Sequence, residues 1–159
     1  MTPRNQRLTF SSMSEQIHGT CVDLSGAGVL LRGPSGSGKS DLALRLIDGG
    51  ASLVADDRVD LEVRDGTLSA SAPAKLAGLI ELRGMGIMRL PCLPRTTIRL
   101  VIDLVDEAAV ERLPEPLACS VLGIESPLIR LSPWSASAAA KVRLAVDAAR
   151  QPSRLVAVL

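Results

Sequence analysis

Eight consecutive residues have the types and the spacing of a phosphate-binding loop. Residues 33–40 read G-P-S-G-S-G-K-S and match the pattern G-x-x-x-x-G-K-[ST]. Glycines let the backbone turn tightly, so that successive N–H groups can point at phosphate oxygens. The pattern places the Lys39 ammonium at the β- and γ-phosphates of a nucleotide and the Ser40 hydroxyl on Mg²⁺. The residues expected around the phosphates are Gly33, Pro34, Ser35, Gly36, Ser37, Gly38, Lys39 and Ser40.

Such a loop lies between a strand and a helix, and the neighbouring residues predict both elements. Residues 29–31 are apolar and form the second arm of a hairpin whose first arm is 19–24. Residues 40–48 have a helical pattern, and Gly49-Gly50 is a strong signal for the end of that helix. The N-terminus of the helix adds positive potential at a bound anion. This context favours a nucleoside triphosphate site over the alternative, a glycine-rich turn before a helix.

Three acidic residues and one histidine are the other candidates for chemistry. Asp56 and Asp57 follow a predicted buried strand at 52–55, a place that suits a magnesium ligand or a catalytic base; a turn start is the alternative. Adjacent side chains of a strand point to opposite faces, so the two carboxylates are expected to have different tasks. Glu81 lies between apolar neighbours, a pattern also typical of a solvated sheet face. His18, the only histidine, stands where the first strand is expected to begin, and a turn or surface role is its alternative.

The rest of the chain predicts more strands than helices. Further expected elements are strands at 60–63, 67–70, 98–105 and 127–131, a strand from residue 79 that two glycines follow, one or two helical turns in 106–113, and a last helix at 135–150. Ser132 is the expected N-cap of the last helix, with Pro133 in its first turn. Residues 1–15 are expected to be a weakly ordered lead-in. Hairpins around one crossover helix favour a single α/β domain with a mixed sheet over a doubly wound parallel one.

Composition argues against several partners. The 159 residues carry a net charge of only +1, which provides no field for nucleic acid or an anionic membrane. With one Trp, one Phe and no Tyr, there is almost no platform for stacking bases. No apolar run approaches the roughly 18 residues of a membrane span. Three widely spaced cysteines favour free thiols in a reducing cytoplasm. We therefore expect a cytoplasmic protein without nucleic-acid or membrane partners.

With these segments placed, the chain resembles the C-terminal catalytic domain of HPr kinase/phosphorylase, a bacterial enzyme that phosphorylates a serine of the phosphocarrier protein HPr. The family reads, in order, H-G, G-x-x-G-x-G-K-S, L-V-A-D-D and L-E-I-R-G-x-G-I. Here the matching segments are His18-Gly19 and residues 33–40, 53–57 and 80–87. The resemblance implies a P-loop kinase domain with a mixed β-sheet, hairpins and a crossover helix after the phosphate loop. It also implies a short form that lacks the N-terminal domain of longer members.

The resemblance implies ATP and Mg²⁺ as cofactors and assigns roles around them. Asp57 corresponds to the general base that takes the seryl proton. Ser40 and Glu81 match the magnesium ligands, and Asp56 is a further candidate ligand, since hard cations prefer oxygen. The implied acceptor is an HPr-type phosphocarrier protein of the bacterial phosphotransferase system. The implied assembly is a homo-oligomer, a hexamer.

Three further residues are assigned to the phosphoryl group by the same resemblance. His18 and Lys39 match residues that support the group during transfer, and Arg112 is similar to a catalytic arginine. Two other functions stay open: a nucleotide-sensing regulator without turnover, and another P-loop enzyme such as a small-molecule kinase or ATPase. Retention of both Asp57 and Glu81 argues against the regulator, because binding alone does not need a base.

The resemblance also implies a reverse reaction, in which inorganic phosphate attacks phosphoserine and pyrophosphate is released. The family's P-V-R-P-G-R stretch aligns with residues 130–135, so that both of its arginines fall on serines, Ser132 and Ser135. Arginine forks suit the binding of two anions, and serine carries no charge. We therefore expect the kinase direction to persist and the reverse direction to be weak, with Arg130 as a candidate replacement.

Overall fold

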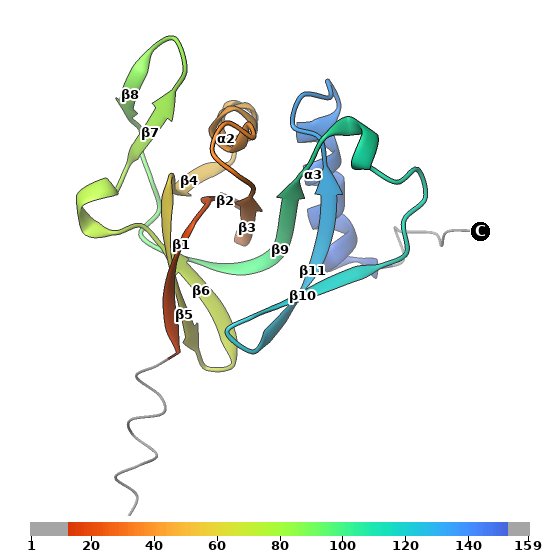
Figure 1. Cartoon of the computed structure of the whole chain (residues 1–159). Helices are drawn as coiled ribbons and strands as arrows, with labels where there is room; N and C mark the ends of the chain where they lie inside the picture. The colour runs from red at the N-terminus through yellow and green to blue at the C-terminus, as the bar shows by residue number, and fades with distance from the viewer. Residues whose placement is uncertain (1–12, 153–159) are drawn as a thin grey trace, which may run out of the picture.

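A large mixed sheet and two helices make up the part of the chain that the structure, a computed structural model, describes, residues 13–152 (Figure 1). Nine strands form this sheet, in the order β1-β5-β6-β9-β3-β2-β4, with β11 beside β9 and β10 beside β11. The strands are β1 (Ser14–His18), β2 (Thr20–Leu24), β3 (Ala27–Arg32), β4 (Ser52–Ala55), β5 (Arg58–Arg64), β6 (Thr67–Ser71), β9 (Thr96–Leu104), β10 (Leu117–Val121) and β11 (Ile124–Leu131). The helices are α2 (Lys39–Asp48) and α3 (Ala138–Arg150).

Two strands and two short 3₁₀ turns lie outside this sheet. β7 (Leu79–Leu82) and β8 (Gly86–Arg89) pair only with each other in the described part, as an antiparallel hairpin that projects from the body (Figure 1). The turns are η1 (Ala74–Leu76) and η2 (Glu107–Ala109). None of the helices in residues 13–152 is long and apolar enough to cross a bilayer.

Strand directions explain where a site can form. β3, β9 and β11 are mutually parallel, whereas β2 runs antiparallel to both β3 and β4. β3 and β4 are therefore parallel to each other, and α2 is the crossover between them. The carboxyl ends of β4, β3, β9 and β11 consequently meet at one edge of the sheet, which is where open α/β sheets place ligands.

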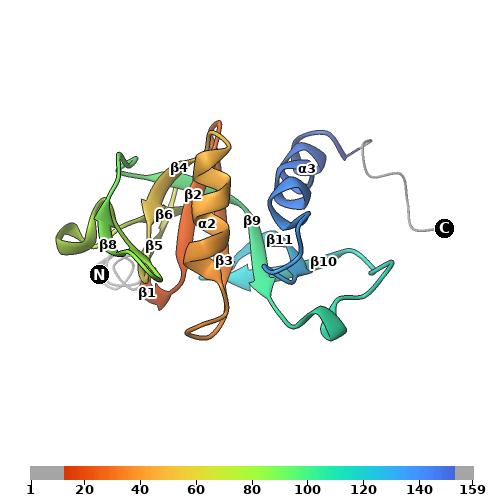
Figure 2. The ribbon, with the colours of Figure 1, turned by 90° about the horizontal axis from the view of Figure 1, so that it is seen from above.

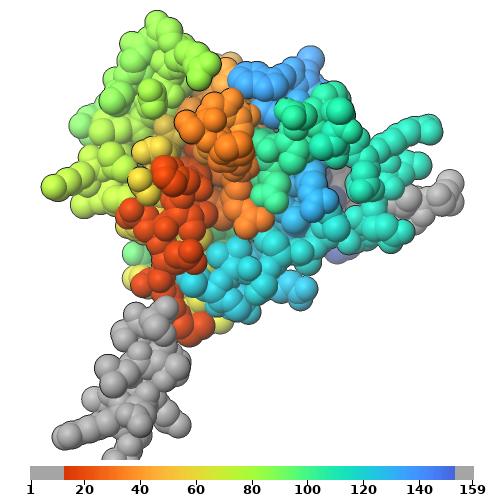
Figure 3. All heavy atoms as spheres, viewed as in Figure 1, coloured from red at the N-terminus to blue at the C-terminus, as the bar shows by residue number. Residues whose placement is uncertain are grey.

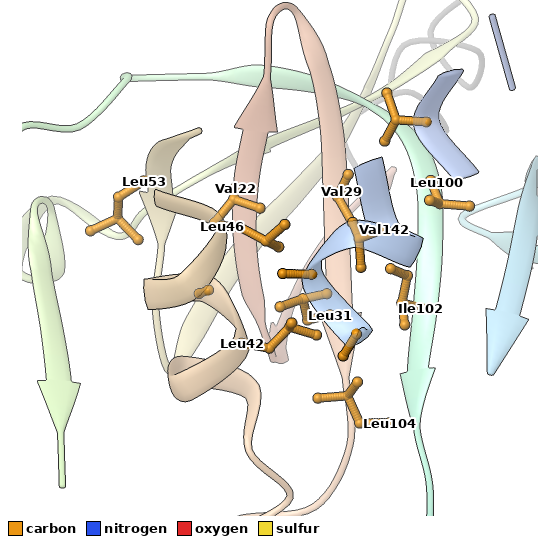
Figure 4. Close-up of a cluster of buried hydrophobic side chains, with 14 of the residues drawn as sticks. Val22, Val29, Leu31, Leu42, Leu46, Leu53, Leu100, Ile102, Leu104 and Val142 are labelled. Carbon is orange, nitrogen blue, oxygen red and sulfur yellow. The ribbon is translucent and has the colours of Figure 1, made fainter. Parts of the chain in front are cut away.

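Both helices cover one face of this sheet (Figure 2). α2 presents Leu42 and Leu46, one helical turn apart, and α3 presents Val142 to the same cluster. These side chains pack against apolar residues of β2, β3 and β9 (Figure 4). The opposite face is covered by a second cluster, in which β5, β6 and β10 pack behind β2, β3 and β9. The glycine-rich loop is thus held between two packed elements, the buried strand β3 before it and the helix α2 after it.

Most predicted elements around the loop are confirmed. The hairpin of β2 and β3 and the strand at 52–55 are present, and α2 begins one residue before the predicted start and ends at Asp48, with Gly49 as its C-cap. The second hairpin turns at Asp65-Gly66, and the strand predicted at 98–105 is present as β9, which begins two residues earlier and ends one residue earlier. All three cysteines are free, and Cys21 is buried. The mixed α/β sheet is confirmed as well.

Several predictions were wrong in their boundaries. The last helix begins at Ala138 and not at 135, with Ser137 at its N-cap, and Ser132 is buried in front of it. Only residues 107–109 of the helix turns predicted in 106–113 are helical, and β10 was missed. Ser14 and Glu15 of the predicted lead-in belong to β1, which pairs with β5 and ends at His18, where a strand was expected to begin; residues 1–12 lie outside the described part.

We predict that Leu46→Ala destabilises the protein by about 2–5 kcal/mol, because it removes a fully buried side chain between α2 and the sheet. Urea unfolding followed by circular dichroism measures the loss. Leu144→Ala is the matched control on α3, since its side chain is 59% exposed, and should change stability by less than about 0.5 kcal/mol. Equal losses for the two variants would contradict the packing described for α2.

Candidate functional site

The Gly33–Ser40 segment runs from the end of β3 into the first turn of α2, at the edge where the parallel strands end. Gly36 and Gly38 have φ values of +80° and +92°, in the left-handed region that favours glycine. Gly38 immediately precedes α2, so that the first N–H groups of the helix follow directly on the turn. Free N–H groups at a helix start, next to left-handed glycines, form a concave anion site. The left-handed glycines and the start of α2 thus lie together at this edge of the sheet.

Lys39 folds back over this loop. Its Nζ donates hydrogen bonds to the carbonyl oxygens of Gly33 at 2.7 Å and Pro34 at 3.0 Å, and lies 3.5 Å from the Ser37 hydroxyl. Partial burial lowers the pKa of Lys39 below its ordinary value of 10.5, while the charge of Asp56, and then that of Asp57, acts in the opposite direction. The ammonium group is held at the loop by weak, neutral acceptors that a phosphate oxygen can replace.

Asp56 is the centre of the hydrogen-bond network at this edge. Its Oδ1 accepts hydrogen bonds from the hydroxyls of Thr20 and Ser40, both at 2.8 Å. Its Oδ2 accepts the backbone N–H of Glu81 at 3.0 Å. The residue is only 4% exposed, and a buried carboxylate is stable only when donors of this kind surround it. One side chain thus joins β2, the start of α2, the end of β4 and β7.

Asp57 has a different environment, as expected of the second acid. Its φ is +70°, and the Arg58 N–H donates to the Asp56 carbonyl at 2.8 Å, so Asp57 is the middle of a tight three-residue turn. A non-glycine residue in this conformation costs about 1–3 kcal/mol, a strain that clusters at functional sites. The turn ends β4 and leaves the Asp57 side chain 68% exposed.

His18 lies beside Asp57. The His18 Nδ1 is 3.9 Å from the Asp57 Oδ1, and the backbone N–H of Gly19 donates to the Asp57 carbonyl at 3.3 Å. His18 is 66% exposed, so both side chains are open to a bound molecule. The H-G pair and the second aspartate, 39 positions apart in numbering (57 minus 18), therefore meet in space.

The side chains of the two remaining predicted site residues, Glu81 and Arg112, make no hydrogen bond to the loop or the aspartates in residues 13–152. The backbone of Glu81 is held by Asp56, and its side chain is exposed on β7. Arg112 is exposed in the segment between η2 and β10, which runs out on the side of β9 away from α2 in both views (Figures 1 and 2). Within residues 13–152, no hydrogen bond or ion pair joins Arg112 to the loop or to either aspartate. The structure does not bring Arg112 together with the other candidates.

The oxygen donors at the loop fit a hard cation such as Mg²⁺. Because Ser40 donates its hydroxyl proton to Asp56, the lone pairs of its oxygen remain available to a metal. No group of three His, Cys, Asp or Glu residues in the described chain is arranged to hold a metal by itself. A cation here would therefore need phosphate oxygens or water in addition to protein oxygens such as that of Ser40.

The sequence reasoning missed Thr20. It is fully buried at the start of β2 and shares Oδ1 of Asp56 with Ser40. The only indication in the sequence was a threonine at a strand position whose side chain, by the alternation of faces along a strand, points into the protein. Its partner lies 36 residues later, and nothing in the sequence indicates that pairing.

The segment that aligns with the family's two arginines, residues 130–135, runs from the end of β11 toward α3. Arg130 is exposed on β11, Ser132 is 5% exposed, and the Ser135 hydroxyl is 3.1 Å from that of Ser137. Neither serine can offer an anion the charge or the fork of an arginine.

Comparison with known proteins gives consistent matches. The family model described as "HPr Serine kinase C-terminal domain" matches residues 9–157. The HPr kinase/phosphorylase of Clostridium novyi (strain NT) is 46% identical over 96 residues, which are 56% of this chain and 31% of that protein. The one from Acidovorax sp. (strain JS42) is 40% identical over 121 residues, 68% of this chain and 38% of that protein. The chain thus spans about a third of the length of these curated relatives.

A solved structure is similar as a whole. The HPr(Ser) kinase/phosphatase from Coxiella burnetii superposes with a TM-score of 0.78 at 27% identity, covering 87% of this chain and 98% of that one. The similarity therefore extends over the sheet and both helices, and not only over the glycine-rich loop.

We predict that Asp56→Ala destabilises the protein by about 2–4 kcal/mol, because three donors lose their common acceptor in a buried site. Chemical unfolding measures the change. Asp48→Ala, which removes an exposed carboxylate at the end of α2, is the control and should stay within about 0.5 kcal/mol. If Asp56→Ala unfolds at the same urea concentration as the control, the carboxylate does not hold this edge together.

Proposed function

This chain belongs to the family of HPr serine kinase C-terminal domains, and on this premise we propose that it transfers the γ-phosphoryl group of ATP to a serine of an HPr-type phosphocarrier protein. The observation that carries the proposal is the division of labour between two adjacent carboxylates beside a glycine-rich loop. Asp56 is buried and holds Ser40, whereas Asp57 is exposed beside His18. A site that only bound a nucleotide would have no need for the second, strained aspartate.

In this proposal the Gly33–Ser40 loop binds the phosphates through its backbone N–H groups and the N-terminus of α2. Lys39 exchanges the carbonyls of Gly33 and Pro34 for phosphate oxygens and neutralises charge at the β–γ bridge. Asp56 orients the Ser40 hydroxyl toward the metal. Glu81, whose backbone is held by the same carboxylate, is the second proposed ligand. When bound, Mg²⁺ would supply charge neutralisation on the phosphate oxygens.

Asp57 is the proposed general base. The seryl oxygen of the acceptor forms a bond to the γ-phosphorus, the bond from that phosphorus to the bridging oxygen breaks, and ADP leaves with the electron pair. The seryl proton passes to the Asp57 carboxylate. Its exposure lets a protein acceptor approach, and the tight turn fixes its direction. His18 lies close enough to assist with the transferred phosphoryl group.

The reverse reaction is supported less well. In it, phosphate would occupy the loop, attack phosphoserine and leave as pyrophosphate, with Asp57 returning the proton. The buried Ser132 and the Ser135–Ser137 pair offer no charge for a second anion, and Arg130 is the exposed cation nearest in sequence. We therefore propose that the kinase direction dominates.

The location and assembly follow from the family. We propose a cytoplasmic protein, since ATP and a phosphocarrier are both found there, and a homo-oligomer. Met85 and Ile87 on the β7–β8 hairpin are 67% and 70% exposed, and they offer apolar surface to a second copy. Arg112 remains the proposed catalytic arginine only if its segment reaches the loop in the complete assembly.

The direct test is incubation with γ-labelled ATP, Mg²⁺ and a purified HPr-type carrier. We expect acid-stable label on a serine of the carrier. Lys39→Ala should lower the rate about 10²–10³-fold, because it removes charge neutralisation at the β–γ bridge. Lys75→Ala, an exposed lysine of η1, is the matched control and should leave the rate unchanged. Release of phosphate without label on the carrier would point instead to an ATPase, and a fully active Lys39→Ala would remove the loop from the mechanism.

A second pair of variants separates the base from the metal ligand. Asp57→Asn should reduce transfer by about 10²-fold or more while nucleotide affinity stays unchanged, since asparagine tolerates the left-handed backbone and only the basicity is lost. Glu81→Gln should raise the Mg²⁺ concentration needed for half-maximal activity. Magnesium titrations of both variants measure the difference. The same shift in metal requirement for both would contradict the assignment of separate roles.

A further inference from the structure

Trp134 is the sole tryptophan of the chain, and no phenylalanine or tyrosine lies in residues 13–152. It stands between β11 and α3, and 66% of it is exposed. A large ring left open to solvent gains little from burial, so packing in the core does not explain it. The question is what its exposed face can contact.

The ring borders the glycine-rich loop. A Cβ placed on Gly38 would lie 3.1 Å from the indole Cη2 of Trp134 and 2.8 Å from the Cγ of Pro133. The contact to Pro133 is too short for a real Cβ and the one to Trp134 is tight, so a side chain at Gly38 would require Pro133 to shift. In the space-filling view, the blue surface of the segment after β11 meets the orange surface of the loop and the start of α2 (Figure 3).

Arg45 fixes the backbone on both sides of Trp134. From α2, its Nη2 donates to the carbonyl of Pro133 and its Nη1 to that of Ser135 at 3.5 Å. Asp41 orients the guanidinium from one helical turn earlier, with a carboxylate oxygen 3.0 Å away. The backbone on both sides of the indole is therefore hydrogen-bonded to the same helix whose N-terminus follows the loop. An exposed side chain with a fixed backbone is preorganised for a ligand.

The sheet order determines which end of a nucleotide faces the indole. Across this edge the strands follow the order β11, β9, β3, β2, β4, and all except the antiparallel β2 have their carboxyl ends here. Asp56 and Asp57 follow β4 on one side of the loop, and Trp134 follows β11 on the other side. A triphosphate whose γ end lies at Asp57 consequently directs its α-phosphate and nucleoside toward Trp134.

From this juxtaposition we propose that Trp134 stacks on the base of the bound nucleotide and supplies part of its affinity. The inference rests on the proposed nucleotide site in the Gly33–Ser40 loop. An aromatic face accepts any base, so the indole contributes to binding while discriminating little between adenine and guanine. The only Trp, Phe or Tyr in residues 13–152 thus lies where a nucleotide base could stack on it.

Fluorescence of the wild-type protein tests the contact directly, because the emission comes from this one tryptophan. Titration with MgATP and with MgADP should change the emission, whereas magnesium tripolyphosphate, which has no base, should bind without that change. Identical changes for all three ligands would overturn the inference, because the indole would then respond only to the loop.

Calorimetric titration of variants supplies the affinity. Trp134→Leu should weaken MgATP binding about tenfold and leave tripolyphosphate binding unchanged, while Trp134→Phe keeps most of the ATP affinity. Leu144→Ala, another exposed apolar residue, is the control for surface hydrophobicity. Unchanged ATP affinity in a folded Trp134→Leu contradicts stacking, and a rise only in KM for the carrier would assign the indole to the acceptor. If the wild type binds neither ATP nor tripolyphosphate, the proposed function itself fails.

Discussion

The buried carboxylate of Asp56 is the interaction on which the candidate site depends. Its two oxygens accept hydrogen bonds from Thr20, Ser40 and the backbone of Glu81, which come from three different elements. Removing an ion from water is costly, and these donors offset that cost only in one relative arrangement of β2, β7 and α2. The same network therefore stabilises the sheet edge and sets where the hydroxyl of Ser40 points. The stability of this edge and the position of the Ser40 hydroxyl therefore both depend on the hydrogen bonds of Asp56.

Around this carboxylate, the candidate functional groups lie along the edge of the sheet where the parallel strands end. The loop follows β3, the two aspartates follow β4, and Trp134 follows β11. β3 and β4 are buried along most of their length, and β11 is partly buried, so the spacing of these groups along the edge is set by the sheet. The strained turn at Asp57 then presents a carboxylate outward, next to the one that is turned inward.

Local patterns predicted much of this arrangement. The loop, its flanking strand and helix, and the strand before the aspartates follow from glycine spacing and apolar runs over a few residues. What failed depends on contacts between distant segments. β1 has the polar sequence S-E-Q-I-H and is a strand only because β5 pairs with it. The last helix starts late because residues 133–137 form turns, in which Arg45 of the distant α2 donates to the carbonyls of Pro133 and Ser135. The partners of Asp56 could not be assigned for the same reason.

In the proposed function, the Gly33–Ser40 loop holds the phosphates of a nucleotide while Asp56 keeps Ser40 in place. The most direct measurement is a crystal structure of the chain with Mg²⁺ and a non-hydrolysable ATP analogue. We expect phosphates inside the loop, Lys39 moved from the Gly33 and Pro34 carbonyls to phosphate oxygens, and the Asp56–Ser40 hydrogen bond retained. Phosphates bound elsewhere on the molecule, or a nucleotide in the loop with Lys39 still on those carbonyls, would contradict it.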